Sequence, residues 1–528
     1  MKNIITIPAT DQNASPLLKE ALTKLSPEQE NLILFEKGTY RFEAEGSDQY
    51  PIFASSSDFC VGAPKTVTVP LIGVKNLTLD GSGSEFVFCD RVQPFFLRDC
   101  ENITLKNFSV DYSFLRYAFA VVTAADEEGF TIRLDSSLFS YSVAGGDILF
   151  HCGKQALSTK DRKISSKGIS RSCGVFFLYS ENATHVVRNL AAPNVTFYAE
   201  ALSDDLIRIR YTNADEKTAF LPGDEICLAY DNDREAQTFS CEFSKQIAVE
   251  NVTIYRQGGM GFVADACEDI RLEHFTICLK PGRKEYFSTT ADGIFLTNCR
   301  GNFLLKDSSV TDTYDDAMNI HGYYMYLKEI LPDGRIVLTH DLHPSHLGVV
   351  ALQTGDRLIF SDPQSMDEVC TATVTDFTYD RDNRKEILVT PDAPCPLYKG
   401  MIVENRDSMP NVVIENNTFR NCPHIRLSAP KALVRHNTFA LNYTDLYIND
   451  LFAYWAECGA VEEILIQENS FSGVAPHNIE ILSCRPETAN RQHGKITIQQ
   501  NTFQKDRDTA ISVTSPVSEL LITDNQFE

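Results

Sequence analysis

The 528-residue sequence has no apolar run of about 18 residues or more, so it predicts no membrane-spanning helix. The opening stretch, MKNIITIPATDQNASP, lacks a continuous apolar segment, so we expect no signal peptide in it. Basic residues are few: 48 Lys and Arg against 72 Asp and Glu give a formal net charge of −24. That charge repels nucleic acid, anionic membranes and polyanionic substrates such as pectin, whereas a neutral sugar is indifferent to it. An acidic surface also keeps any chain soluble, so the net charge excludes these classes of partner but does not identify the actual partner.

The 15 cysteines form no Cys-x-x-Cys pair, and their number is odd. Neither zinc ligation nor a disulfide framework is expected from such scattered positions. We interpret these cysteines as small buried hydrophobic residues. The hydrophobic share of 43% is enough for a sizeable core and argues against disorder.

One short pattern recurs through the C-terminal third of the chain. An alternating apolar run is followed by a polar corner, an asparagine, a small or polar residue and a phenylalanine. The five asparagines are Asn417, Asn437, Asn469, Asn501 and Asn525, separated by 20, 32, 32 and 24 residues. Each repeat supplies two or three short strands that cannot bury their inward face alone, so we expect the repeats to stack about 4.8 Å apart.

This stacking predicts an all-β chain folded as a right-handed parallel β-helix. An asparagine at each corner can pass hydrogen bonds along the stack and tolerates a left-handed backbone. A leucine-rich repeat is the alternative, but its signature is richer in Leu and more regular in length.

Two stretches interrupt the repeats, and we expect each to be a small antiparallel β-barrel-like module inserted into the helix. Ser15-Pro16 begins a predicted cap helix, with Ser15 as its N-cap. The predicted organisation is 1–110 for the cap and first coils, 111–244 for the first insertion, 245–321 for the central coils, 322–409 for the second insertion and 410–528 for the C-terminal coils.

The densest polar pattern lies in the central coils. Asp292 precedes the pair Asp315-Asp316 by one coil length, so all three side chains are expected on one face. Carboxylates this close repel each other, and at least one should keep a proton near neutrality. Glycoside hydrolysis needs that division, a protonated acid beside an ionised base. An Asp-Asp pair alone is commonly a solvated turn, but Asn319 and His321 follow it with strand alternation.

These residues carry a resemblance. ADG (291–293), YDDAMNIHG (314–322) and YWAECGAVEEILIQENSF (454–471) resemble glycoside hydrolase family 110, over essentially the whole chain. Cys458 stands where that family usually has Ser, and both residues are small. The resemblance implies a bacterial exo-acting α-1,3-galactosidase, of the kind that removes the terminal galactose of the blood group B antigen. It further implies an inverting mechanism, no metal or cofactor, and a periplasmic or extracellular location.

The order of the three carboxylates is also similar to that of the polygalacturonases, another β-helix family. By this analogy Asp315 is the general acid, while Asp292 and Asp316 position and deprotonate the water. Inverting enzymes commonly hold their carboxyls about 6.5–9.5 Å apart. Adjacent coils alone give a separation nearer 5 Å, which favours retention. Inversion is therefore an expectation from the resemblance, not from the spacing.

Six further side chains are candidate sugar contacts. They are Asn319, His321, Trp455, Glu457, Arg283 and Arg426. Trp455 is the only tryptophan and could pack on the C–H face of galactose, or equally against an insertion. His321 could equally be a structural histidine, and Arg283 a solvated surface residue.

Two other functions stay open. A pectin-type hydrolase needs Lys or Arg to hold galacturonate, and between the carboxylate motifs the sequence offers only Arg300 and Lys306. A β-helix could also bind glycans without cutting them. The expected partner is a glycan ending in α-galactose, and a homo-oligomer is possible.

Overall fold

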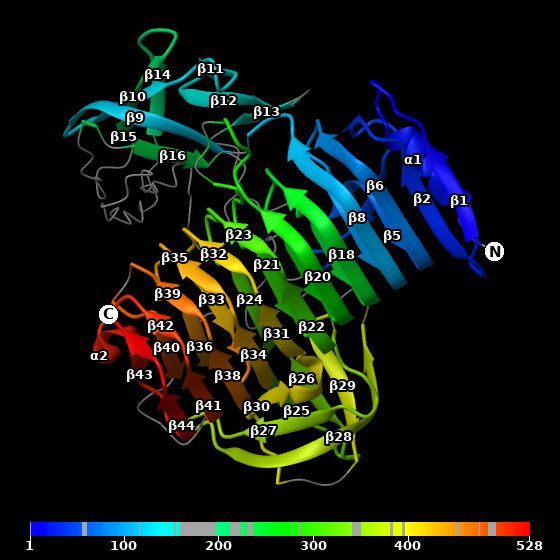
Figure 1. Ribbon diagram of the computed structural model, residues 1–528. Helices are drawn as coiled ribbons and strands as arrows, with labels where there is room; N and C mark the ends of the chain where they lie inside the picture. Colours follow the sequence, from blue (N-terminus) through cyan, green and yellow to red (C-terminus); the bar gives the residue numbers. More distant parts are fainter. Residues whose placement is uncertain are drawn as a thin grey trace. The chain divides into compact units, whose positions relative to one another are not determined.

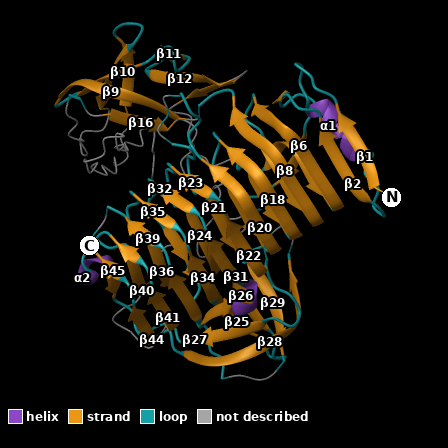
Figure 2. Cartoon of the chain, in the orientation of Figure 1, coloured by secondary structure: helices purple, strands orange, loops and turns teal. Residues whose placement is uncertain are grey.

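The computed structural model describes residues 2–54, 61–115, 117–152, 155–158, 197–211, 222–223, 225–229, 236–283, 285, 287–340, 350–380, 384–392, 396–450, 455–474, 476–483 and 493–528. Strands dominate these residues, and helices are short (Figure 2). The chain divides into two compact units. The first comprises Met1–Val87, Val92–Asp111 and Glu235–Glu528, and the second comprises Phe88–Arg91 and Tyr112–Arg234.

The first unit is a stack of coils whose strands form long parallel rows (Figure 1). One row contains β1 (Lys2–Ile7), β2 (Glu30–Phe35), β6 (Lys75–Phe88), β8 (Glu101–Tyr112), β18 (Lys245–Ile254), β20 (Glu268–Ile277), β22 (Arg300–Lys306), β31 (Asn411–Glu415), β34 (Lys431–Arg435), β38 (Glu463–Gln467), β41 (His493–Gln499) and β44 (Val517–Thr523). Alternate residues of these strands point inward and are buried, which explains the alternating apolar runs of the sequence.

A second, shorter row follows the corner after each of the later strands. It contains β23 (Ser309–Thr311), β32 (Thr418–Arg420), β35 (Thr438–Ala440), β39 (Ser470–Ser472), β42 (Thr502–Phe503) and β45 (Gln526–Phe527). β3 (Thr39–Phe42) follows β2 near the N-terminal end.

The third row carries the candidate site. It contains β5 (Pro64–Ile72), β7 (Gln93–Arg98), β17 (Phe239–Glu242), β19 (Phe262–Asp265), β21 (Ile294–Thr297), β24 (Met318–Tyr323), β33 (Ile425–Leu427), β36 (Leu446–Asp450), β40 (Ile479–Ser483) and β43 (Ile511–Val513), all parallel. β4 (Asp48–Pro51) pairs antiparallel with β5, and β37 (Glu457–Cys458) pairs antiparallel with β24. The predicted parallel β-helix is confirmed.

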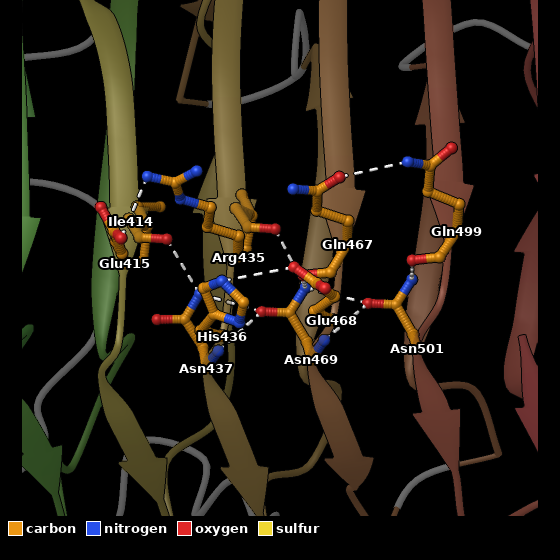
Figure 3. A network of polar contacts seen from close by, with 11 residues as sticks. Ile414, Glu415, Arg435, His436, Asn437, Gln467, Glu468, Asn469, Gln499 and Asn501 are labelled. Carbon is orange, nitrogen blue, oxygen red and sulfur yellow. Dashed lines mark hydrogen bonds and ion pairs between the residues drawn. The ribbon is translucent and has the colours of Figure 1, made fainter.

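The repeated asparagines form a hydrogen-bonded ladder along the stack (Figure 3). Asn469 shows the pattern: its Oδ1 accepts from the backbone N–H and the Nδ2 of Asn437, at 2.9 and 3.0 Å. Its own Nδ2 donates to Asn501 Oδ1 and to the carbonyl oxygen of Val434. Each rung therefore satisfies the polar groups of the next inside the stack.

The left-handed backbone falls one residue earlier than the sequence suggested. A φ between 54° and 58° is found at each residue directly before a ladder asparagine: Asn416, His436, Glu468, Gln500 and Asp524. The ladder and the corner are thus built by different residues. The recurring phenylalanines stack inside, with ring centroids 4.7 Å apart for Phe439 and Phe471.

The predicted cap helix is present as α1 (Ser15–Thr23), beside β1 and β2 at the N-terminal end of the stack (Figure 1). Ser15 is the first helical residue, so its assignment as the N-cap was wrong. The N-cap position is Ala14, and the side chain of Asn13 accepts the Ser15 N–H at 3.0 Å. Ser15 Oγ instead donates to the carbonyl oxygen of Glu43. The other helices are short, α2 (Arg507–Ala510) and the 3-10 turn η2 (Arg406–Ser408), and none within the described ranges could cross a bilayer.

After β24 the chain leaves the coils and forms a closed antiparallel barrel. Its strands are β25 (Met325–Ile330), β26 (Ile336–Thr339), β27 (Arg357–Ser361), β28 (Glu368–Tyr379), β29 (Glu386–Pro391) and β30 (Ile402–Asn405). The barrel has its own apolar core. Arg300 of the coil stack pairs with Asp356 of the barrel through two contacts of 2.7 and 2.6 Å. Arg300 therefore anchors the insertion.

The second unit is antiparallel in the part that the structure describes. Five strands make one sheet: β14 (Phe197–Ala201), β15 (Leu206–Tyr211), β10 (Gly129–Leu134), β9 (Tyr117–Asp126) and β16 (Glu225–Ala229). Three more make another: β11 (Tyr141–Ala144), β12 (Asp147–Cys152) and β13 (Gln155–Ser158). Residues 127 and 128 connect β9 to β10.

Candidate active site

Asp292 and Asp316 occupy adjacent coils, each two residues before its strand. Ile294 of β21 lies opposite Met318 of β24, and the Gly293 N–H donates to the Asp316 carbonyl oxygen at 2.8 Å. Both aspartates are buried, with exposed fractions of 4% and 5%. Asp315 is half-buried, and its carboxylate accepts the Asp316 N–H at 3.1 Å. One corner of two stacked coils thus holds all three predicted carboxylates.

Gly293 makes this close stacking possible. A Cβ atom built on Gly293 would lie 2.6 Å from the Ala317 carbonyl oxygen and 2.8 Å from Cγ1 of Val310. Any other residue would push the corner of one coil away from the next. The ADG motif therefore requires its glycine for the packing of adjacent coils, in addition to the aspartate as a candidate catalytic residue.

Two side chains from the next coil bind Asp316. His424 Nε2 lies 2.8 Å from Oδ1, and Arg426 Nε donates to Oδ2 at 3.1 Å. Burial raises the pKa of Asp316, but the charges and hydrogen bonds of His424 and Arg426 outweigh it. The pKa of Asp316 therefore lies below its ordinary value. From the sequence alone we expect a carboxylate repelled by its neighbours, whereas here two basic side chains compensate the repulsion at Asp316.

The guanidinium of Arg426 is the electrostatic centre of the site. Burial lowers its pKa, but the negative charges of Asp316, Glu457, Asp315 and Asp292 raise the pKa of Arg426 above its ordinary value. Its Nη1 lies 3.9 Å from Glu457 Oε2. Four carboxylates, three from two adjacent coils and one from β37, therefore act on one cation.

His321 lies in the same neighbourhood and is fully buried. Its Nδ1 donates to the Gly322 carbonyl oxygen at 2.9 Å, which leaves Nε2, 3.6 Å from Glu457 Oε1, without the proton in the neutral ring. Burial lowers the pKa of His321 despite that carboxylate, so the ring is neutral at pH 7. His321 thus presents an acceptor nitrogen towards the site.

Four buried polar atoms here have no hydrogen-bond partner within the described residues. They are Asn319 Oδ1, Thr290 Oγ1, His321 Nε2 and His424 Nδ1. Asn319 lies beside Arg426 in the strand register, and Thr290 lies two residues before Asp292. Buried polar groups are normally paired, so these atoms have hydrogen-bonding capacity left for a ligand.

One predicted contact residue, Arg283, is placed differently. Arg283 binds Asp111, with Nη1 and Nη2 at 3.0 and 2.7 Å from its carboxylate oxygens, next to Lys280. It therefore belongs to a separate ion-pair cluster at the end of β8. Trp455 is 37% exposed, two residues before Glu457.

One outward-facing row of residues crosses this sheet and passes through the site. We call it the site row: Phe96, Ser240, Val263, Phe295, Asn319, Arg426, Tyr447 and Glu480. The first four are no more than 2% exposed, whereas the last three are half-buried. The row therefore has a covered end and an open end, and Asn319 lies at the boundary.

The segment after β4 covers the closed end. Ile52 and Ala54 pack on Phe96, Val263, Phe295 and Ala291, the residue before Asp292. The buried carboxylate of Glu242 holds this segment by accepting the backbone N–H groups of Phe53 and Ala54.

Two arginines flank Phe53. Arg98 lies 5.3 Å from the ring centroid, and Arg384 of the barrel lies 3.5 Å from it. Arg98 Nε also donates to Glu242 at 2.9 Å. The cover is therefore fixed both to the sheet and to the second insertion.

His424 and the open end of the row were not predicted from the sequence. His424 directly precedes β33 and lies two residues before Arg426, which is the spacing of side chains on one face. That alternation was the available signal, but the barrel separates this coil from Asp316 in sequence. Among the described residues, no group of three His, Cys, Asp or Glu side chains is arranged to hold a metal ion.

Fold and site together define a class: a parallel β-helix protein with a cluster of carboxylates on one face of its stack. The sequence comparisons narrow it further. The chain is 28% identical over 535 residues to alpha-1,3-galactosidase B of Phocaeicola vulgatus, covering 94% of this chain and 82% of that protein. It is 27% identical to alpha-1,3-galactosidase A of Shewanella woodyi, covering 94% and 80%. The predicted resemblance to the α-1,3-galactosidases is therefore confirmed.

No protein-family model matches the chain. Among solved structures it is similar to the polygalacturonase of Erwinia carotovora ssp. carotovora, with 9% identity, a TM-score of 0.38 and coverage of 99% of this chain and 92% of that one.

Proposed function

We propose that this protein is a glycoside hydrolase that releases terminal α-1,3-linked galactose from glycans. One observation carries the proposal: Asp292, Asp315, Asp316 and Glu457 all act on the guanidinium of Arg426. Such a cluster can supply both a proton donor and a proton acceptor. The activity in the names of the relatives agrees with this chemistry.

The environment of Asp316 supports a division of roles. His424 and Arg426 favour its ionised form, which suits a base that activates water and excludes a proton donor. Asp292, on the neighbouring coil, is proposed to orient the same water. Asp315 is then the general acid, in keeping with its greater exposure. We propose inversion at the anomeric carbon, as the resemblance to family 110 implies.

The covered end of the site row supports removal of a terminal residue. Ile52 and Ala54 occupy the outer face up to Phe295 and Ala291, so a glycan cannot continue in that direction. Galactose is proposed to bind at the boundary between the covered and the open end of the site row. There Asn319 Oδ1 and Thr290 Oγ1 can accept hydrogen bonds from its hydroxyl groups. His321 and Glu457 offer further acceptors.

The charge balance argues against a pectin-type substrate, although for another reason than the scarcity of basic residues between the carboxylate motifs. Basic residues do lie in the site, since His424 and Arg426 come from the next coil. Arg426 is already shared among four carboxylates, and Arg300 is bound by Asp356. A galacturonate carboxylate would therefore meet uncompensated negative charge.

Hydrolysis assays test the proposal. We expect free galactose from p-nitrophenyl α-galactoside and from Gal-α-1,3-Gal, with β-galactose as the first anomer in NMR spectra. Comparison of a branched blood group B trisaccharide with the linear disaccharide shows which acceptor is preferred. If high enzyme concentrations release no galactose, the protein is a glycan binder. If α-galactose forms first, the mechanism is retaining.

A further inference from the structure

The open end of the site row lies on the side of the catalytic cluster away from the cover. Tyr447 follows Arg426 in the strand register, and Glu480 follows Tyr447. At about 4.8 Å per coil, they lie roughly 5 and 10 Å along the stack from Arg426. We propose that Tyr447 and Glu480 form an acceptor platform, with the buried Thr444 holding Glu480 in place, and that this platform binds the sugar to which the terminal galactose is attached. This inference rests on the proposed function.

The direction follows from the cover. A terminal galactose has no sugar on its non-reducing side, so its ring can lie against a closed wall. The rest of the glycan must leave by the other side, and within the described part of the row only the residues from Arg426 onward are accessible. The glycan is therefore directed across β36 and β40.

The platform is continuous with the catalytic cluster. The Tyr447 ring lies 4.6 Å from the ring of His424, which binds Asp316, and 5.8 Å from the Arg426 guanidinium. This packing holds the tyrosine in place while leaving it half-exposed. A fixed aromatic ring is suited to pack on the C–H face of a pyranose, with its hydroxyl as a polar handle.

Glu480 supplies the polar part of the platform. Its Oε1 accepts from Thr444 Oγ1 at 3.1 Å, and it also acts on Tyr447, whose pKa is raised by burial first and by Glu480 second. An ionised carboxylate has about four acceptor positions, so capacity remains for two sugar hydroxyl groups. The Glu480 carboxylate can therefore recognise a neutral sugar by accepting hydrogen bonds from two of its hydroxyl groups.

An exposed aromatic residue extends the same edge. Tyr443 is 55% exposed in the turn before β36, where its N–H donates to the Cys422 carbonyl oxygen. On the following coil Val474 is 43% exposed, and its N–H donates to the Asn442 carbonyl oxygen. A third sugar residue would meet this edge, so longer substrates should depend on Tyr443.

The test separates acceptor binding from catalysis by changing the leaving group. α-Galactosyl fluoride carries no acceptor sugar, whereas Gal-α-1,3-Gal and its trisaccharide place one and two sugars on the platform. We expect Glu480→Gln to lower kcat/KM for the disaccharide relative to the fluoride by about 10-fold, mainly through KM, as loss of a charge-assisted hydrogen bond predicts. Tyr443→Ala should lower only the trisaccharide ratio.

Glu463→Gln is the matched control, because Glu463 is an exposed carboxylate on β38, in a different strand row. Equal losses on fluoride and disaccharide, or unchanged ratios in both variants, would overturn the platform. A wild-type protein that hydrolyses neither substrate would instead overturn the proposed function.

Discussion

The central coils and the C-terminal coils share one backbone plan but fill it differently. In the C-terminal coils each corner holds an asparagine, buried in all but the last coil, and each inner position behind it holds a phenylalanine. The ladder continues to Ser308, whose N–H donates to Asn417 Oδ1 at 2.9 Å. Ser308 lies in the coil that carries Asp315 and Asp316, so no asparagine continues the ladder at the level of the site.

The inner column changes at the same place. Phe419 lies opposite Val310, and Val310 lies opposite Ile277. On the outer face, the column of Asp292 and Asp316 continues with His424, and Arg426 occurs once in the site row. The long runs of identical buried side chains therefore stabilise the stack, and the changing outer side chains carry the proposed chemistry. Activity and stability should respond to substitutions in different coils.

The largest expected effect is on activity in the central coils. Asp315→Asn and Asp292→Asn should each lower kcat by about 10³-fold or more, because general acid–base catalysis alone contributes about 10²–10⁴-fold. The thermal midpoint should change little, since the amide keeps the size of the carboxyl group.

Asp524→Asn is a suitable control, because Asp524 is an exposed aspartate at the last corner of the ladder, where Asn tolerates φ of 54°. Calorimetry with steady-state kinetics separates the two effects. A variant at 292 or 315 with near-normal kcat would remove that residue from the catalytic cluster.

A ladder substitution should show the opposite pattern. Asn469→Ala leaves the N–H of Asn437 and the carbonyl oxygen of Val434 without their partners inside the stack. Each unsatisfied buried group costs about 1–3 kcal/mol, so we expect a loss of roughly 3 kcal/mol in unfolding free energy with kcat unchanged.

Asn525→Ala should cost less, because Asn525 is half-buried in the last coil and water can replace its bonds. Denaturant titration of both variants measures the difference. Equal destabilisation would mean that the ladder does not depend on burial.

The contrast between regions also explains what the sequence could predict. Regular repeats in the C-terminal coils predicted the β-helix, since a recurring Asn and Phe imply stacked, equivalent positions. The left-handed corner residue could not be assigned, because the five residues before the ladder asparagines have five different side chains and share only their backbone conformation.

The candidate site was predictable where the coil is uninterrupted. Asp292 and Asp316 are 24 residues apart, and the register of β21 and β24 has the same offset. His424 lies 108 residues after Asp316, because the barrel is inserted between adjacent coils. The cover at Ile52 and Ala54 was equally hard to predict, since the hydrogen bond that holds it joins Ala54 to Glu242, 188 positions away. Sequence spacing finds neighbours only within one unbroken stack.

The smallest effect concerns a buried acid where the ladder region meets the acceptor platform. Asp445 accepts hydrogen bonds from Asn442, Asn478 and the Gly473 N–H. Burial nevertheless raises the pKa of Asp445 to about 6. In the unfolded chain an aspartate has a pKa of about 3.9.

Because the pKa of Asp445 is raised in the folded protein, its contribution to the unfolding free energy falls as the pH rises. Below about pH 4 the group is protonated in both states. Between about pH 4 and pH 6 only the unfolded chain releases the proton, so this contribution to stability is lost as the pH rises. Two pKa units correspond to roughly 2–3 kcal/mol.

Asp445→Asn removes this titration, so its unfolding free energy relative to the wild type should rise by about 2 kcal/mol from pH 4 to pH 7. Denaturant titration at several pH values measures the change. Glu463→Gln serves as the control, because that side chain is in water in both states. A difference between Asp445→Asn and wild type that stays constant with pH would mean that Asp445 is ionised in the folded stack, and that its three hydrogen bonds outweigh burial.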